Sequence, residues 1–130
     1  MISGMVVFAG KFPERRYLVK ILNWKEVKVS DNPHGVDARK MYDTEHAQVI
    51  HILLKPGESL KKHITPVDVI FYVLEGRGTV EIGDEKKEVD VDSLIESPAG
   101  IPHCWYNEGD KILRFLVIKV PRPVKPTRLL

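Results

Sequence analysis

Two histidines stand out as groups that could do chemistry, His63 in the segment KKHITP and His103 in the segment GIPHCWYN. Neutral imidazole nitrogens bind manganese, iron, nickel and zinc ions, and imidazole also transfers protons near neutral pH. If both rings face one apolar cavity, they need hydrogen-bond partners or an ion, since an unpaired buried polar group costs roughly 1–3 kcal/mol. These two histidines are therefore the predicted centre of a site.

A catalytic metal generally needs about three protein ligands, so further donors must be sought near the histidines. Thr65 follows His63 by two residues and shares its face in a strand, where the hydroxyl could hold a water or a substrate oxygen. His51 lies between two isoleucines and is a candidate third nitrogen, with a hydrogen-bonded core residue as the alternative. The predicted metal ligands are thus His63, His103 and, as the third candidate, His51.

Three other polar residues are weaker candidates. Asp68 would point to the opposite face of a regular strand and would reach inward only through a bulge. His34 and His46 stand in polar, turn-like surroundings that are typical of surface or loop residues.

The segments that must position these residues are short runs rich in Val, Ile, Phe and Tyr, bounded by Gly, Pro, Asp or Asn. Almost nothing recurs at helical spacing, so the pattern predicts an all-β sandwich or barrel. Gly83-Asp84-Glu85 is expected to close a hairpin. The expected strands are residues 5–9, 17–22, 26–29, 38–42, 47–54, 67–74, 78–82, 87–91, 93–96, 103–106 and 112–120.

Strand alternation also predicts a pocket around the histidines. With His103 facing inward, Trp105 shares its face, while Cys104 points away and is expected to be a small buried hydrophobic residue. A mostly apolar wall with a few convergent polar groups is the usual composition of a small-molecule site. The predicted substrate pocket consists of Thr65, Phe71, Val73 and Trp105.

Two separated motifs in this region resemble those of the cupin superfamily. Seven residues match the two motifs: Gly57, His63, Gly76, Pro98, Gly100, His103 and Asn107. The chain departs from the pattern at three places, with Thr65 at the second histidine, Val69 at the glutamate and Asp92 at the second motif's glycine. The resemblance covers about residues 47–120 and implies a cupin-type double-stranded β-helix, or jelly-roll barrel. The apolar runs within residues 1–25 add the expectation of extra N-terminal strands or an arm packed on this barrel.

The resemblance implies a small-molecule pocket inside the barrel around His63 and His103 that binds a divalent transition metal. In cupins such sites serve metal-dependent dioxygenases and isomerases, among other activities, and the sequence leaves open whether this chain is an enzyme. The alternative is a metal-free module that binds or stores a small ligand, because two of the family's metal ligands are replaced. Cupins are often dimers, so a homodimer is expected.

The composition argues against nucleic acid and a membrane as partners of the chain. The 130 residues carry 20 Lys plus Arg and 18 Asp plus Glu, a net charge of +2, which is too small to favour nucleic acid. No stretch approaches the roughly 20 apolar residues of a membrane span. The lone Cys104 forms no intrachain disulfide, and a reducing cytoplasm is the expected location.

The chain is expected to divide into three parts. Residues 1–25 are expected to form an N-terminal arm or extra strands, and residues 26–120 the barrel. Residues 121–130 are expected to form a Pro-rich basic tail, either solvated or partner-binding.

Overall fold

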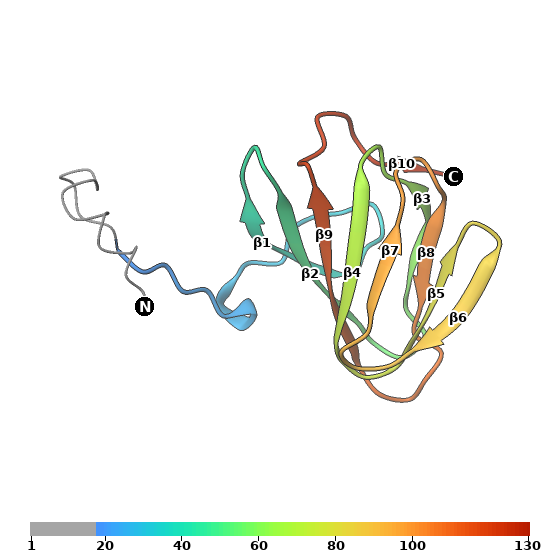
Figure 1. The fold of residues 1–130 in the computed structure, drawn as a ribbon. Helices are drawn as coiled ribbons and strands as arrows, with labels where there is room; N and C mark the ends of the chain where they lie inside the picture. Colours follow the sequence, from blue (N-terminus) through green and yellow to red (C-terminus); the bar gives the residue numbers. More distant parts are fainter. Residues whose placement is uncertain (1–17) are drawn as a thin grey trace, which may run out of the picture.

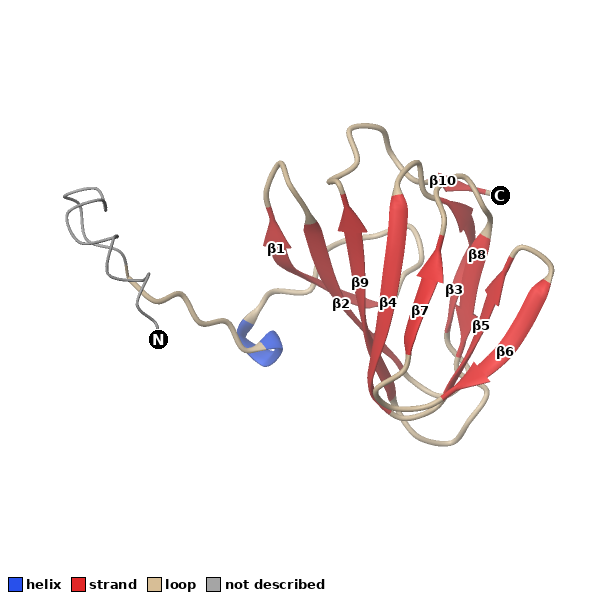
Figure 2. Ribbon diagram, in the orientation of Figure 1, coloured by secondary structure: helices blue, strands red, loops and turns tan. Residues whose placement is uncertain are grey.

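Two five-stranded sheets face each other in the computed structural model, which describes residues 18–130 (Figures 1 and 2). The first sheet has the strand order β1-β2-β9-β4-β7 and the second β10-β3-β8-β5-β6, and every neighbouring pair is antiparallel. The strands are β1 (Asp37–Asp43), β2 (Gln48–Leu54), β3 (Ser59–Ile64), β4 (Asp68–Glu75), β5 (Gly78–Ile82), β6 (Glu85–Val89), β7 (Leu94–Ser97), β8 (His103–Tyr106), β9 (Leu113–Val120) and β10 (Arg128–Leu129). The all-β jelly-roll prediction is confirmed.

The differences from the predicted strands lie mostly at the two ends. The expected strand at 5–9 lies outside the described residues, and residues 18–22 form an extended arm that leads away from the barrel (Figure 1). The predicted strand at 26–29 is replaced by a short 3-10 helix, Trp24–Glu26, and a loop. Residues 128–129 of the tail pair with β3, so the tail folds back onto the barrel. Within residues 18–130, no helix is long and apolar enough to cross a bilayer.

The core lies between the sheets and follows from strand alternation. Every second residue of β4 and of β9 is buried, which gives the inward rows Val69, Phe71, Val73 and Leu113, Phe115, Val117. Trp105 of β8 stacks on Phe115 across the barrel, with ring centroids 4.1 Å apart. These aromatic rings fill the middle of the barrel, and a cavity lies to one side of them, lined by residues of β1, β2 and β9.

Candidate functional site

The two histidines of the motifs face each other inside the barrel. His63 on β3 and His103 on β8 are a cross-strand pair, and their side chains are almost fully buried. A register shift between Leu60 and His63 brings His63 opposite His103. The two Nε2 atoms are 3.0 Å apart, so the rings form a hydrogen-bonded imidazole pair.

A tight turn delivers His103 to the start of β8. Gly100 has a φ of +79°, a conformation that favours glycine, and its amide donates to the Thr65 carbonyl at 3.0 Å. The amide of Ala99 donates to the Asp68 carboxylate at 2.9 Å. Asp68 therefore faces away from the histidines, as the alternation predicts, and holds the turn in place.

The hydrogen-bond partners of the two imidazole rings show which nitrogen of each ring carries the proton. His63 Nδ1 contacts the Lys61 carbonyl oxygen, which only accepts, so Nδ1 carries the proton and Nε2 is a bare acceptor. His103 Nε2 then donates to His63 Nε2, and His103 Nδ1 accepts from the Ser97 hydroxyl at 2.6 Å. The result is a chain of hydrogen bonds from Ser97 through both rings to the backbone.

Burial keeps both rings neutral. It lowers the pKa of His103 to about 3, and the charges of His63 and Lys119 act in the same direction. Burial also lowers the pKa of His63, while the hydrogen bond to the Lys61 backbone opposes this shift. Near neutral pH the pair therefore carries no charge. Thr65, also buried, places its hydroxyl oxygen 3.4 Å from His103 Nε2.

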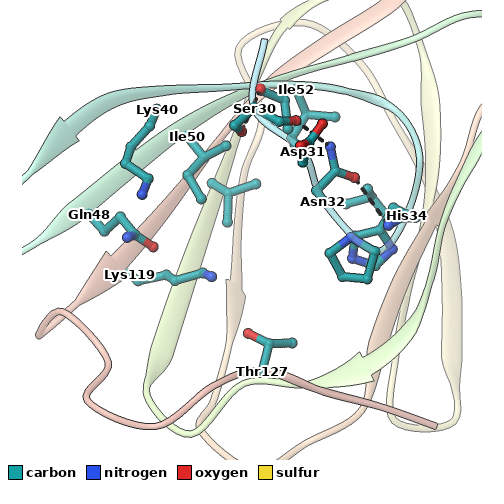
Figure 3. A pocket seen from close by; sticks show the side chains of 14 residues that line it. Ser30, Asp31, Asn32, His34, Lys40, Gln48, Ile50, Ile52, Lys119 and Thr127 are labelled. Atoms are coloured by element: carbon teal, nitrogen blue, oxygen red, sulfur yellow. Dashed lines mark hydrogen bonds between the residues drawn. The ribbon is translucent and has the colours of Figure 1, made fainter. Parts of the chain in front are cut away.

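A cavity of about 290 Å³ lies beside this pair, at the mouth of the barrel (Figure 3). Aliphatic side chains form much of its wall: Ala38, Ile50, Ile52, Leu60 and Val117. The loop from Ser30 to His34 closes one side, and Thr127 of the folded-back tail closes another. His34 joins the cavity to the imidazole pair, because its ring lies edge-on to His63 with centroids 4.8 Å apart.

Positive charge is concentrated in this cavity. Lys40 and Lys119 both line it, and the only acid among its described lining residues is Asp31, on the exposed loop. Lys40 is paired with Asp43, at 3.5 Å. Lys119 is half-buried and points into the cavity (Figure 3), and among residues 18–130 no carboxylate lies within 4.0 Å of its ammonium group. Burial, together with the charge of Lys40, lowers the pKa of Lys119.

Comparison with known proteins places the chain in a family. The sequence profile of the Cupin domain matches residues 50–119, more than half of the chain. The chain belongs to the cupin family. An uncharacterised protein of Methanocaldococcus jannaschii is 31% identical to this cupin over 87 residues, which cover 66% of this chain and 75% of that protein.

Solved structures agree with the fold. A protein from Thermus thermophilus is 28% identical, with a TM-score of 0.70 over 81% of this cupin and 100% of that chain. The polyketide cyclase RemF from Streptomyces resistomycificus is 24% identical, with a TM-score of 0.75 over 87% of this cupin and 86% of that chain. At this identity the likeness to RemF shows the fold alone.

The divalent metal that the family implies can be tested against the donor atoms of this cupin. The spacing of the two Nε2 atoms, 3.0 Å, is close to that of two ligands about 2.1 Å from one ion, and the carbonyl on His63 Nδ1 is a typical outer partner of a metal-binding histidine. A third ligand is missing. Val69, at the family's glutamate position, belongs to the core. Within residues 18–130, no group of three or more His, Cys, Asp or Glu side chains could hold a metal ion.

Two further observations oppose a resident metal. His34, the nearest additional imidazole, accepts the Lys61 amide at Nδ1, at 2.9 Å, so its proton lies on the other nitrogen. Lys119 adds a positive charge close enough to lower the pKa of both His63 and His103. The residues present do not fit a tightly held divalent ion.

His51 does not join the two motif histidines. Its neighbours Ile50 and Ile52 line the cavity, so His51 projects from the opposite face of β2. There it accepts a hydrogen bond from Arg114 at 2.8 Å and stacks on Trp24 of the arm, with centroids 4.4 Å apart. Burial lowers the pKa of His51 to about 4. This histidine anchors the N-terminal arm on the outside of the barrel.

The predicted pocket residues occupy the barrel but not the cavity. Phe71, Val73 and Trp105 are core residues with at most 1% of their surface exposed, and none of them lines the cavity. Phe71 packs edge-on against His103, with centroids 5.2 Å apart. Of the predicted pocket, only Thr65 contacts the imidazole pair through a polar atom.

Sequence reasoning missed three cavity residues, Lys119, Gln48 and His34. A signal for the first was present, because Lys119 continues the inward row of Leu113, Phe115 and Val117 on β9. Gln48 likewise continues the row of Ile50 and Ile52 on β2, which it shares by alternation. His34 gave no such signal, because the fold of its loop decides where it points.

Proposed function

We propose that this cupin binds a small organic anion with a short aliphatic body in the cavity at the barrel mouth, without a resident metal. One observation supports the proposal above all others. The half-buried Lys119 ammonium points into an aliphatic cavity, and no carboxylate among the described residues lies within 4.0 Å of it. An unpaired charge in such surroundings is costly, and an anionic ligand would relieve that cost.

The cavity has complementary parts for such a ligand. Lys119 and Lys40 offer positive charge, and the Gln48 side chain, which also lines the cavity, offers an amide. Ile50 and Val117 are among the side chains that would cover an aliphatic body. A volume of about 290 Å³ is the liquid volume of roughly ten water molecules, at about 30 Å³ for each, which is room for a small organic ligand.

Calorimetric titration with three ligands of equal chain length tests the proposal. Hexanoate carries a carboxylate, 1-hexanol is neutral and hexylamine is cationic. We expect hexanoate to bind more tightly than either of the others, and its affinity to fall with added salt, as an exposed charge pair would. Equal affinity for hexanol or hexylamine would contradict the proposal, as would no binding of hexanoate.

Variants then assign the effect to the cavity. We expect Lys119→Met to weaken hexanoate binding by about tenfold, the equivalent of roughly 1.4 kcal/mol. Lys111 is exposed and does not line the cavity, so Lys111→Met is the matched control and should bind as the wild type does. Elemental analysis of the untagged protein completes the test, because one equivalent of a tightly held transition metal would overturn the metal-free part of the proposal.

A further inference from the structure

Lys119 differs from two nearby lysines, Lys40 and Lys62, in its surroundings. Lys40 has Asp43 within 3.5 Å, and Lys62, on the outer face, has Glu81 within 3.6 Å. Lys119 has no such partner among the described residues, and its neighbours across the sheet are Gln48 on β2 and Val69 on β4. No acid therefore holds this amine in its charged form.

We propose that Lys119 is a nucleophile that forms an imine with the carbonyl carbon of a small oxo acid held in the cavity. The inference rests on the proposed function, because the carboxylate of the oxo acid is the anion that the cavity would bind. Lys40, which forms an ion pair with Asp43, lines the cavity and is placed to hold that carboxylate, and Lys119 lines the same cavity as the attacking amine.

The surroundings of Lys119 increase the fraction of this amine that is neutral and reactive, while its ammonium form is the one that attracts the anion. Burial lowers its pKa, and the nearby charge of Lys40 acts in the same direction. A lysine in an apolar pocket beside a second cation is a recognised arrangement for an amine nucleophile. The neighbouring imidazoles His63 and His103 are themselves uncharged near neutral pH, so they do not stabilise the ammonium form.

The reaction balances without any other reagent. The lone pair of the Lys119 amine forms a bond to the carbonyl carbon, and the electron pair of the C=O bond moves to oxygen, which takes a proton from the amine. The resulting carbinolamine loses its hydroxyl group together with the second amine hydrogen as water, and the C=N bond forms. One amine and one carbonyl compound thus give one imine and one water.

Reductive trapping tests this step on the full chain. The protein is incubated with 2-oxobutanoate and sodium cyanoborohydride, which reduces an imine to a stable secondary amine, and the modified lysine is located by peptide mass spectrometry. We expect labelling at Lys119 to exceed labelling at the exposed Lys111 by about tenfold or more, because Lys119 lines the cavity that holds the oxo acid and reacts with a bound neighbour. Butanone, which lacks the carboxylate, should label Lys119 less than 2-oxobutanoate does.

Lys119→Arg separates this inference from the proposed function. Arginine keeps the positive charge but forms no such imine, so this variant should lose the adduct while hexanoate binding falls less than in Lys119→Met. Lys111→Arg, at an exposed position outside the cavity, should keep both properties. Hexanoate binding without an adduct at Lys119, or an adduct spread evenly over surface lysines, would overturn the imine and leave anion binding intact. Absence of hexanoate binding would instead refute the proposed function.

Discussion

Replacement of Asn107 is predicted to destabilise the barrel without affecting its cavity. This motif residue is 1% exposed, and its amide nitrogen donates to the carbonyls of Leu54 at 2.9 Å and Lys111 at 2.8 Å. Its side-chain oxygen accepts from the amide of Gly109 at 3.1 Å. The side chain therefore joins the end of β2 to the loop between β8 and β9.

The magnitude follows from these three bonds. At about 1 kcal/mol for each, Asn107→Ala should lower the free energy of unfolding by about 3 kcal/mol, and by more where the Leu54 carbonyl stays out of reach of water. Domains of this kind have total stabilities of about 5–15 kcal/mol, so the loss should be plain in urea unfolding followed by tryptophan fluorescence. Asn107→Asp should cost at least as much, because a carboxylate cannot donate to either carbonyl.

The exposed Asn23 is the matched control for the buried Asn107. Asn23 is exposed and accepts one hydrogen bond, from the Lys25 amide, so Asn23→Ala should cost about 1 kcal/mol or less. Hexanoate affinity of the folded Asn107→Ala protein should equal that of the wild type, since Asn107 does not line the cavity. A loss of stability below about 1 kcal/mol, or full tolerance of Asn107→Asp, would refute the structural role.

Three further predictions concern a buried histidine, a glycine in a turn and the buried cysteine. The pKa of His51 is about 4 in the folded state against an ordinary 6.5, so the unfolded chain takes up the proton first. Its contribution to stability is complete above pH 6.5 and is lost as the pH falls toward 4, and His51→Leu should flatten the stability profile there by up to about 1.4 kcal/mol per pH unit. Gly76 has a φ of +84°, and a Cβ would collide with the Ile112 carbonyl oxygen, so Gly76→Ala should cost about 3 kcal/mol or more in thermal unfolding. Gly57→Ala, with a φ of +88° but open space, should cost less. Cys104 is buried, which raises its pKa, so Ellman's reagent should modify it only after unfolding; rapid reaction of the native protein would contradict its inert role.

Much of the barrel could be predicted from alternation and turn residues. The strand at 103–106 and the hairpin of β5 and β6 correspond to the predicted elements, and Cys104 faces Glu81 on the side opposite His103, as alternation requires. The strand β3 was not predicted, because its sequence SLKKHI carries two lysines and a register shift that breaks the period of two. Such a strand is recognisable only through its partner β8.

Local sequence patterns predict only part of the site. The facing of His63 and His103 follows from the motifs, whereas the neutral state of both rings depends on burial and on Lys119, far away in sequence. The apolar run around residue 51 makes His51 a candidate ligand. In the structure Ile50 and Ile52 line the cavity, so by alternation His51 lies on the outer face of β2. Its partners there, Trp24 and Arg114, come from the arm and from β9, so the sequence around residue 51 does not indicate these contacts.

The balance of charge decides between a metal and an anion in this barrel. A divalent ion held by two neutral imidazoles needs a negative ligand to offset its charge, and the place where cupins carry that glutamate is occupied here by the buried Val69. Lys119 is the direct cross-strand partner of Val69, so positive charge lies next to the position of the missing carboxylate. At an effective dielectric constant near 20, two unit charges about 4 Å apart interact by about 4 kcal/mol, which repels a cation and attracts an anion. The replacement of the carboxylate and the lysine beside it therefore act in the same direction, and together they favour an organic anion over a metal ion as the ligand of this cavity.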